Sequence, residues 1–125
     1  MKLPILVALA LVVAAPPLRA GTAPADGASE ETCNDAKSTT EIVQCLATQT
    51  AIWDRRLNTA YQKLLASLPP RRRDRLRNAQ RLWVQFRDAN CAYFASGQGS
   101  ITRIEAGQCM LRLTAARAQE LEEQT

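Results

Sequence analysis

The stretch NAQRLWVQFRDANC, residues 78–91, decides the fold. Apolar side chains recur in it and just before it at steps of three and four residues, which is the spacing of an α-helix that buries one face. A helical projection at about 100° per residue collects the candidate buried residues on one side. They are Leu76, Ala79, Trp83, Phe86 and Asn90. We therefore predict a helix that places Trp83 and Phe86 in the core.

The arginines of this helix fall at two kinds of position. Arg77 and Arg81 lie one turn apart on the side opposite the apolar stripe, so we expect them to face solvent, where they are candidates for binding a partner. Arg87 lies at the boundary of the stripe, where its stem can pack on apolar neighbours while the guanidinium reaches oxygen acceptors. The candidate acceptors on the other helices are Asn58, Tyr61 and Thr114. We favour a structural link between helices over a binding role for Arg87, which stays a binding candidate.

The segment before this stretch predicts another helix. The sequence STTE at residues 38–41 has the form of a capping box, which marks a helix start. Apolar residues follow at helical spacing over residues 42–68, and Leu57 and Tyr61 among them are candidate core residues. The Pro69-Pro70 pair ends this helix, and the next begins near Pro70, which suits a first helical position.

A third helix is predicted after the sequence SGQGS, residues 96–100, which breaks the second. The sequence TRIE at residues 102–105 is another capping-box candidate. Its apolar side consists of Ile104, Cys109, Leu113, Ala116 and Leu121. Short links favour antiparallel neighbours, and no strand pattern of comparable length occurs. The sequence therefore predicts an all-α fold, a small three-helix antiparallel bundle.

The chain begins with the layout of a secretory signal peptide. Lys2 precedes an apolar run that only Pro4 interrupts, and small residues and prolines follow. We predict a signal peptide over residues 1–20, with cleavage as late as residue 25; a retained amphipathic anchor is the alternative. Residues 21–37 are expected to be a flexible lead-in and residues 122–125 a frayed tail. We expect a periplasmic or secreted protein without a stable membrane anchor after cleavage.

Four cysteines remain after cleavage, and an even number in a small exported domain indicates disulfides. Zinc is disfavoured because no cysteine pair has metal-binding spacing and the chain has no histidine. Four cysteines allow three pairings. Antiparallel packing brings the end of the second helix to the start of the third, so we favour Cys91–Cys109, which leaves Cys33–Cys45 to pin the lead-in. Two disulfides then staple the bundle.

Composition narrows the classes of function that the protein can have. Removal of residues 1–20 takes away Lys2 and Arg19 and lowers the formal net charge from +4 to +2, so general attraction to polyanions is weak. The local asymmetry is large, because residues 71–87 hold seven arginines and one aspartate. The absence of histidine excludes Ser-His and Cys-His nucleophile pairs. We expect no enzyme activity and no cofactor, catalytic or metal site, and the inward aromatics and export argue against nucleic acid.

The motifs resemble those of the LprI-like family. The sequence from Leu57 to Leu65 is similar to its L-N-x-x-Y-x-x-x-L segment, and residues 76–91 are similar to its central L-x-x-A-Q-R-x-W-x-x-x-R-D-A-x-C signature. The closing G-S…C…T…R…L run is similar to Gly99, Ser100, Cys109, Thr114, Arg117 and Leu121. The resemblance covers about residues 33–121, so the predicted domain, residues 38–121, is an LprI-like helical domain.

The resemblance implies an exported, disulfide-bonded, non-catalytic binding protein that inhibits lysozyme and so protects the cell wall. In that reading lysozyme is the partner, and Arg87 or Arg103 approaches its catalytic carboxylates. The alternative is a general envelope interaction module that binds another envelope protein or an anionic surface through residues 71–81. The sequence leaves the oligomeric state open.

Overall fold

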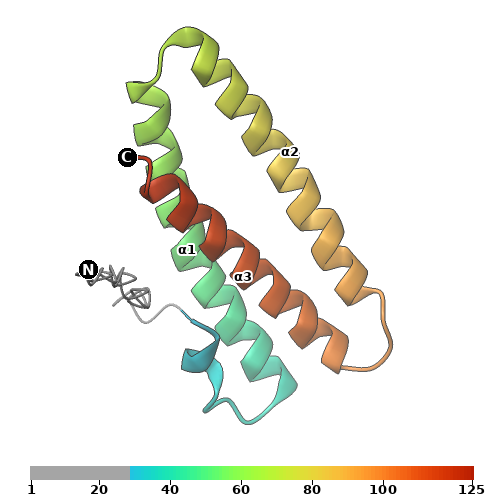
Figure 1. Cartoon of the computed structure of the whole chain (residues 1–125). Coiled ribbons are helices and arrows are strands. Elements are labelled where there is room, and N and C mark those ends of the chain that lie inside the picture. The colour runs from blue at the N-terminus through green and yellow to red at the C-terminus, as the bar shows by residue number, and fades with distance from the viewer. Residues whose placement is uncertain (1–28) are drawn as a thin grey trace, which may run out of the picture.

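Three α-helices make up most of residues 29–125, the part of the chain that the structure, a computed structural model, describes (Figure 1). Helix α1 spans Thr39–Ser67, α2 spans Pro70–Ala95 and α3 spans Ile101–Glu122, and a short 3-10 helix, η1, spans Glu30–Cys33. Consecutive α-helices run antiparallel. These residues form no strand, so the predicted all-α three-helix fold is confirmed. The predicted signal peptide and its cleavage sites lie outside the described residues.

The helix boundaries follow from local chemistry. Ser38 Oγ accepts a hydrogen bond from the backbone N–H of Glu41 at 3.2 Å, which caps α1 as predicted. Pro70 is the first residue of α2, as expected. The second capping-box prediction is wrong, because α3 begins at Ile101 and already contains Thr102. The Thr102 hydroxyl instead donates to the Gly99 carbonyl at 2.8 Å.

The core lies mainly between α1 and α3, which run in the same general direction (Figure 1). Its buried members on these two helices are Leu46, Trp53, Leu57, Ala60, Leu64, Leu111, Ala118 and Leu121. Gly107 permits close approach of the helices, because a Cβ atom there would lie 3.1 Å from Leu46 Cδ1. Tyr61 and Trp83 are partly buried and pack against this core.

Helix α2 packs on α3 with a face that only partly matches the prediction, because Leu76, Trp83 and Asn90 lie inward as expected. Its partly or fully buried central residues are Leu76, Gln80, Trp83, Val84, Arg87, Asn90 and Cys91, here called the α2 seam. Phe86 is 56% exposed and Ala79 is also exposed, so the prediction that they point inward is wrong. The reason is that α3 contacts the side of α2 that carries Gln80 and Cys91. The inward face of α2 therefore mixes apolar and polar residues, while several large apolar side chains point outward.

Two disulfides join consecutive elements of the chain. Cys33–Cys45 ties η1 to α1, and Cys91–Cys109 ties the end of α2 to the first half of α3, which confirms the favoured pairing. An ion pair of 3.2 Å between Arg112 and Glu30 also attaches η1 to α3. Part of the predicted lead-in is thus the ordered helix η1. Within residues 29–125, none of the helices has the length and apolar character that crossing a membrane requires.

Candidate binding surface

The exposed arginines of α2 interact with neighbours one turn away. Arg77 forms an ion pair of 3.0 Å with Asp74, and both side chains are more than half exposed. Arg81 donates a hydrogen bond to the Asn78 side chain. Both arginines face solvent, as the sequence predicts. Exposed contacts of this kind restrain a side chain weakly, because water competes for both partners.

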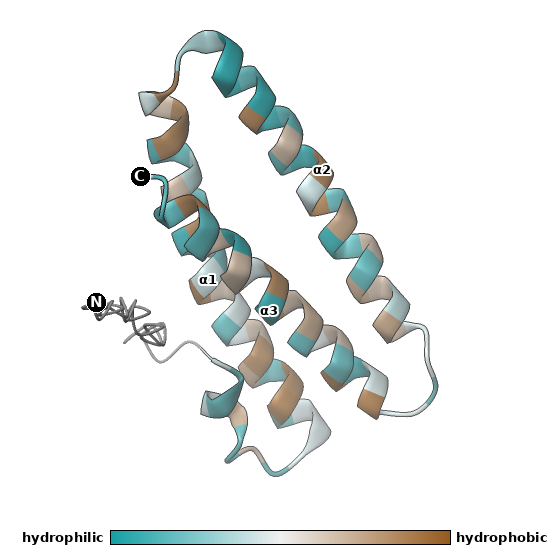
Figure 2. Cartoon of the chain, viewed as in Figure 1, coloured by the Kyte–Doolittle hydropathy of each residue, from teal (hydrophilic) through white to brown (hydrophobic). Residues whose placement is uncertain are grey.

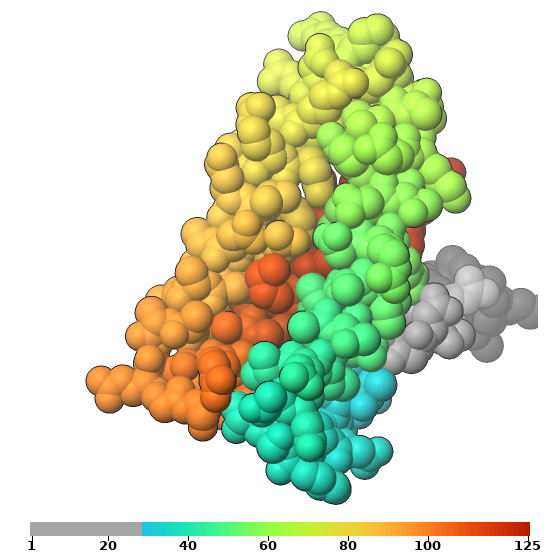
Figure 3. Space-filling model, turned by 180° about the vertical axis from the view of Figure 1, so that it is seen from behind, coloured from blue at the N-terminus to red at the C-terminus, as the bar shows by residue number. Residues whose placement is uncertain are grey.

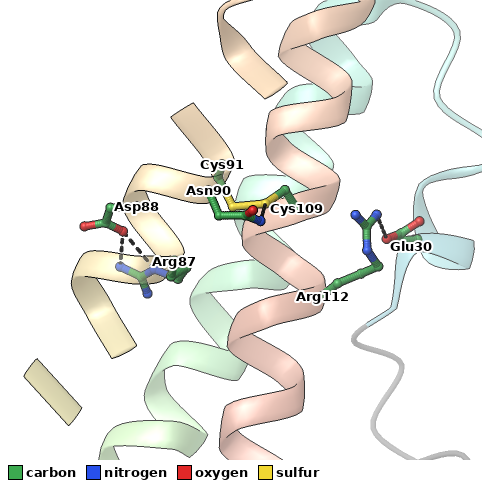
Figure 4. Close-up of a disulfide and its surroundings, with 7 residues drawn as sticks. All are labelled: Glu30, Arg87, Asp88, Asn90, Cys91, Cys109 and Arg112. Atoms are coloured by element: carbon green, nitrogen blue, oxygen red, sulfur yellow. Dashed lines mark hydrogen bonds and ion pairs between the residues drawn. A yellow bond between two sulfur atoms is a disulfide. The ribbon is translucent and has the colours of Figure 1, made fainter. Parts of the chain in front are cut away.

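Arg87 lies in the α2 seam and is much less accessible than the other candidate arginines. Its side chain is 14% exposed, and both Nε and Nη2 lie 2.9 Å from Asp88 Oδ1 (Figure 4). Its guanidinium also stands 5.1 Å from the centre of the Trp83 ring, which adds a cation–π contact. The expected partners on α1 and α3 are therefore replaced by neighbours on α2. These contacts make Arg87 a packing residue of the seam.

A different arginine provides the polar link between helices. Arg117 Nε donates to Gln80 Oε1 at 3.1 Å across the α2–α3 contact, and Arg117 Nη1 pairs with Glu120 at 2.8 Å. The Arg117 side chain is only 11% exposed. Sequence reasoning did not assign this role. The signal was present, since Gln80 and Arg117 both belong to the motif positions that resemble the LprI-like family.

The turn between α2 and α3, with the first residues of α3, forms an exposed end of the molecule (Figure 1). We call residues 96–103 the tip. Residues 96–100 are exposed, Ile101 is 54% exposed, and Arg103 is exposed on the first turn of α3. No hydrogen bond or ion pair of the Arg103 side chain occurs with any residue between 29 and 125. The tip therefore offers an apolar side chain and a guanidinium.

Several contacts fix the shape of the tip. Gly99 has a φ of 85°, a left-handed conformation that favours glycine. A Cβ atom at Gly97 would lie 2.7 Å from the Thr102 methyl group, so the turn packs tightly on α3. The Cys91–Cys109 disulfide closes the segment that contains the tip, and Asn90 Nδ2 donates to Cys109 Sγ at 3.4 Å (Figure 4). These contacts restrain the conformation of the tip.

A shallow groove adjoins the tip on one side. Its volume is about 600 Å³, and Arg103, Met110 and Asp54 are among the residues that line it. The walls come from the first half of α1, the end of α2 and the start of α3. Figure 3 shows α3 between α1 and α2 on the face seen from behind. Most of the other lining residues are small and apolar.

The titratable groups give no sign of a reaction centre in the described part of the chain. Over residues 29–125, no cluster of three or more His, Cys, Asp or Glu side chains is arranged to hold a metal ion. All four cysteines are in disulfides. The pKa of Glu122 is lowered, first by its hydrogen bond to Arg56, and this pair lies far along α3 from the tip. What the surface supplies is contact area and hydrogen-bond donors.

Comparison with known proteins gives one match. A family model described as lysozyme inhibitor LprI matches residues 30–121, which include η1, all three α-helices except the last residue of α3, and both disulfides. No curated protein and no solved structure matches the chain.

Proposed function

The chain belongs to the LprI family, described as lysozyme inhibitor, and from that premise we propose that it is an exported binding protein that blocks the substrate cleft of a lysozyme. The family match over residues 30–121 is the observation that carries the proposal. The two disulfides support export, since such bonds persist in oxidising compartments. Inhibition by binding would protect the cell wall in the periplasm or outside the cell.

We propose that the tip is the part that enters the cleft. A lysozyme cleft is concave and carries two carboxyl groups beside the bond that it cleaves. The tip is exposed at one end of the bundle and presents the Arg103 guanidinium next to the apolar Ile101. Arginine is common at the energetic centres of protein interfaces, where it pairs with carboxylates. Its lack of a partner among residues 29–125 leaves the Arg103 guanidinium available for such a pair.

The rigidity of the tip favours this role. A loop that is already in its bound shape loses less conformational entropy on binding than a flexible loop does. The disulfide, the Gly97 contact and the Thr102 hydrogen bond each restrict the tip. Because the net charge expected after the predicted cleavage is only +2, attraction would come from the local guanidinium rather than from the whole molecule.

A lysis assay tests the proposal. Purified mature protein in excess should slow the clearing of cell-wall suspensions by at least one c-type or g-type lysozyme. Arg103→Ala should weaken inhibition by about tenfold or more, as expected for loss of an interfacial charge pair. Arg81→Ala removes an equally exposed arginine away from the tip and should leave inhibition unchanged.

Two results would count against the proposal at different levels. Undiminished lysis by several c-type and g-type lysozymes would exclude lysozyme inhibition. Inhibition that Arg81→Ala weakens and Arg103→Ala does not would assign the contact to the arginine-rich face of α2 instead. The envelope-module alternative is not favoured by the family match and stays a prediction from the sequence.

A further inference from the structure

Helix α2 carries an exposed apolar stripe that no part of residues 29–125 covers. Leu82 is 54% exposed, Phe86 56% and Tyr93 72%, and these are three of the four exposed large apolar residues of the described chain. Together with two exposed alanines they form the α2 stripe: Ala79, Leu82, Phe86, Ala89 and Tyr93. Single exposed apolar residues are ordinary, but five on one line of a helix call for a partner.

The spacing of the stripe is that of a helix–helix contact. Its steps of three, four, three and four residues repeat every seven residues, as in the seam of a coiled coil. The stripe and the α2 seam lie on different sides of the helix, since the seam faces α3. Apolar residues recur along the length of α2, the outermost helix in this view (Figure 2).

The stripe is complementary to itself in one orientation. Two copies of α2 can run antiparallel about a two-fold axis that passes between them at the level of Val84. Leu82 of each copy then faces Phe86 of the other, and Ala79 faces Ala89. Arg75 lies four residues before Ala79, on the same line of the helix. It faces Tyr93 of the other copy, where its guanidinium can stack on the ring. In a two-fold interface every such contact occurs twice. Large residues meet large ones, and small residues meet small ones and permit close approach.

Charge selects the same orientation. Arg71, Arg72 and Arg73 stand at the positive N-terminal end of α2, where their charges are unfavourable to the helix dipole. Antiparallel pairing places them beside the negative C-terminal end of the second α2, whose residues 92–96 carry no charge. The two Arg72 residues would then be about 36 Å apart at 1.5 Å per residue. Salt screens charges over about 8–10 Å, so the two clusters do not repel, whereas parallel pairing would bring them together.

We propose that the protein forms an antiparallel homodimer through the α2 stripe. The stripe and its flanking Arg75 extend for about 27 Å along one helix. A contact along a single helix of this length buries little area compared with a standard interface, which buries about 1,200–2,000 Å². The dimer is therefore a weak one that forms at micromolar concentrations. The two tips lie at opposite ends of the dimer, so this inference does not depend on the proposed lysozyme contact.

Sedimentation of the purified mature protein tests the dimer. The average mass of the wild-type protein should rise from monomer toward dimer as its concentration increases from about 1 to 300 µM. Leu82→Glu and Phe86→Lys should each raise the concentration at the midpoint of the monomer–dimer transition at least tenfold. Each substitution buries a charge against an apolar residue at both of the two equivalent contacts. Gln85→Glu is the matched control, since it adds the same charge next to Phe86 but off the stripe and should leave the midpoint unchanged. Circular dichroism should show unchanged helicity in all variants.

Mixing the two charged variants tests the orientation. In the antiparallel dimer, Leu82→Glu in one copy meets Phe86→Lys in the other at one of the two equivalent contacts, and the second contact is wild-type. The mixture should therefore form heterodimers at concentrations where each variant alone is monomeric. A parallel dimer has no such pairing and would show no rescue. A monomeric wild-type protein at about 300 µM, unaffected dimerisation in the variants, or absence of rescue would each overturn the proposal.

Discussion

The α1–α3 pair and helix α2 are stabilised in different ways. Between α1 and α3 most buried residues are apolar, although Gln49, Thr102 and Thr114 are also buried, and Gly107 lets the helices come close. Helix α2 instead meets α3 through a seam that contains Gln80, Arg87 and Asn90, and a disulfide closes the contact. The core helices thus rely mainly on burial of apolar surface, whereas α2 adds polar contacts and a covalent link to the packing of Leu76 and Trp83.

This difference explains how a small domain can present apolar groups to solvent. Most of the large apolar residues of α1 and α3 lie in the core, where each buried leucine contributes about 1.5–3 kcal/mol. Helix α2 is attached through its seam and Cys91–Cys109, and its apolar stripe makes no part of that contact. The stripe and the tip are then available for partners without loss of the core.

The largest expected effect comes from a leucine in the α1–α3 core. Leu121 is fully buried, so Leu121→Ala should lower the free energy of unfolding by about 3–5 kcal/mol through lost burial and the cavity that remains. Leu82→Ala changes the same residue type on the exposed side of α2 and should cost less than about 0.5 kcal/mol. Urea titration at submicromolar protein, where the proposed dimer is absent, measures both. Equal losses would show that the two regions do not differ as described.

Removal of the Cys91–Cys109 disulfide should destabilise α2 more than the α1–α3 pair. In the chain-entropy picture, a bridge between residues 18 apart contributes about 3 kcal/mol. Replacing both cysteines by alanine should therefore speed hydrogen exchange throughout α2, while the amides of α1 and α3 between the core leucines stay protected.

The second disulfide is the matched control for this prediction. Replacement of Cys33 and Cys45 by alanine opens a bridge of similar size, with a separation of 12 residues, but frees η1 rather than α2. Exchange in α2 should then remain slow. A uniform rise in exchange over all three helices in the Cys91/Cys109 variant would mean that α2 and the core unfold together.

The sequence predicted the helices, their approximate bounds and both disulfides, because apolar periodicity, Ser38, the proline pair and cysteine placement are local signals. It placed Leu76, Trp83 and Asn90 of α2 on the inward side correctly but wrongly added Ala79 and Phe86. Two lines of residues on α2 have helical spacing, one through Leu76 and Trp83 and one through Leu82 and Phe86. Periodicity cannot choose between them, because the choice depends on where α3 lies.

The same reasoning applies to the polar residues of the seam. A half-buried arginine was expected to link helices, and Arg117 does so by donating to Gln80. The prediction named Arg87 instead, because a projection of one helix shows that a residue is near the boundary but not which acceptor stands opposite. Arg103 was named as a binding candidate from the resemblance alone, and its availability depends on the course of the turn.

The smallest expected effect concerns an ion pair at the far end of the α1–α3 contact. Arg56 Nη2 and Glu122 Oε2 are 2.8 Å apart, and Arg56 also stacks on Trp53 at 4.0 Å. Glu122, the first residue of the predicted frayed tail, is therefore still helical and paired; fraying of residues 123–125 stays a prediction. Both side chains are partly exposed, so Glu122→Gln should cost only a few tenths of a kcal/mol.

The pH dependence of this pair has a defined sign. The hydrogen bond from Arg56 lowers the pKa of Glu122 below its ordinary value of 4.5, although desolvation opposes the shift. A lowered pKa in the folded state means that the pair stabilises the protein above about pH 4.5 and that this contribution is lost as the pH falls through the folded pKa. The difference in unfolding free energy between the wild type and Glu122→Gln should therefore be constant from pH 5 to 7, roughly, and shrink below pH 4.5. Glu123→Gln, an exposed neighbour, is the control for loss of a carboxylate. A difference that grows on acidification would show that the carboxylate at Glu122 does not stabilise the contact between α1 and α3.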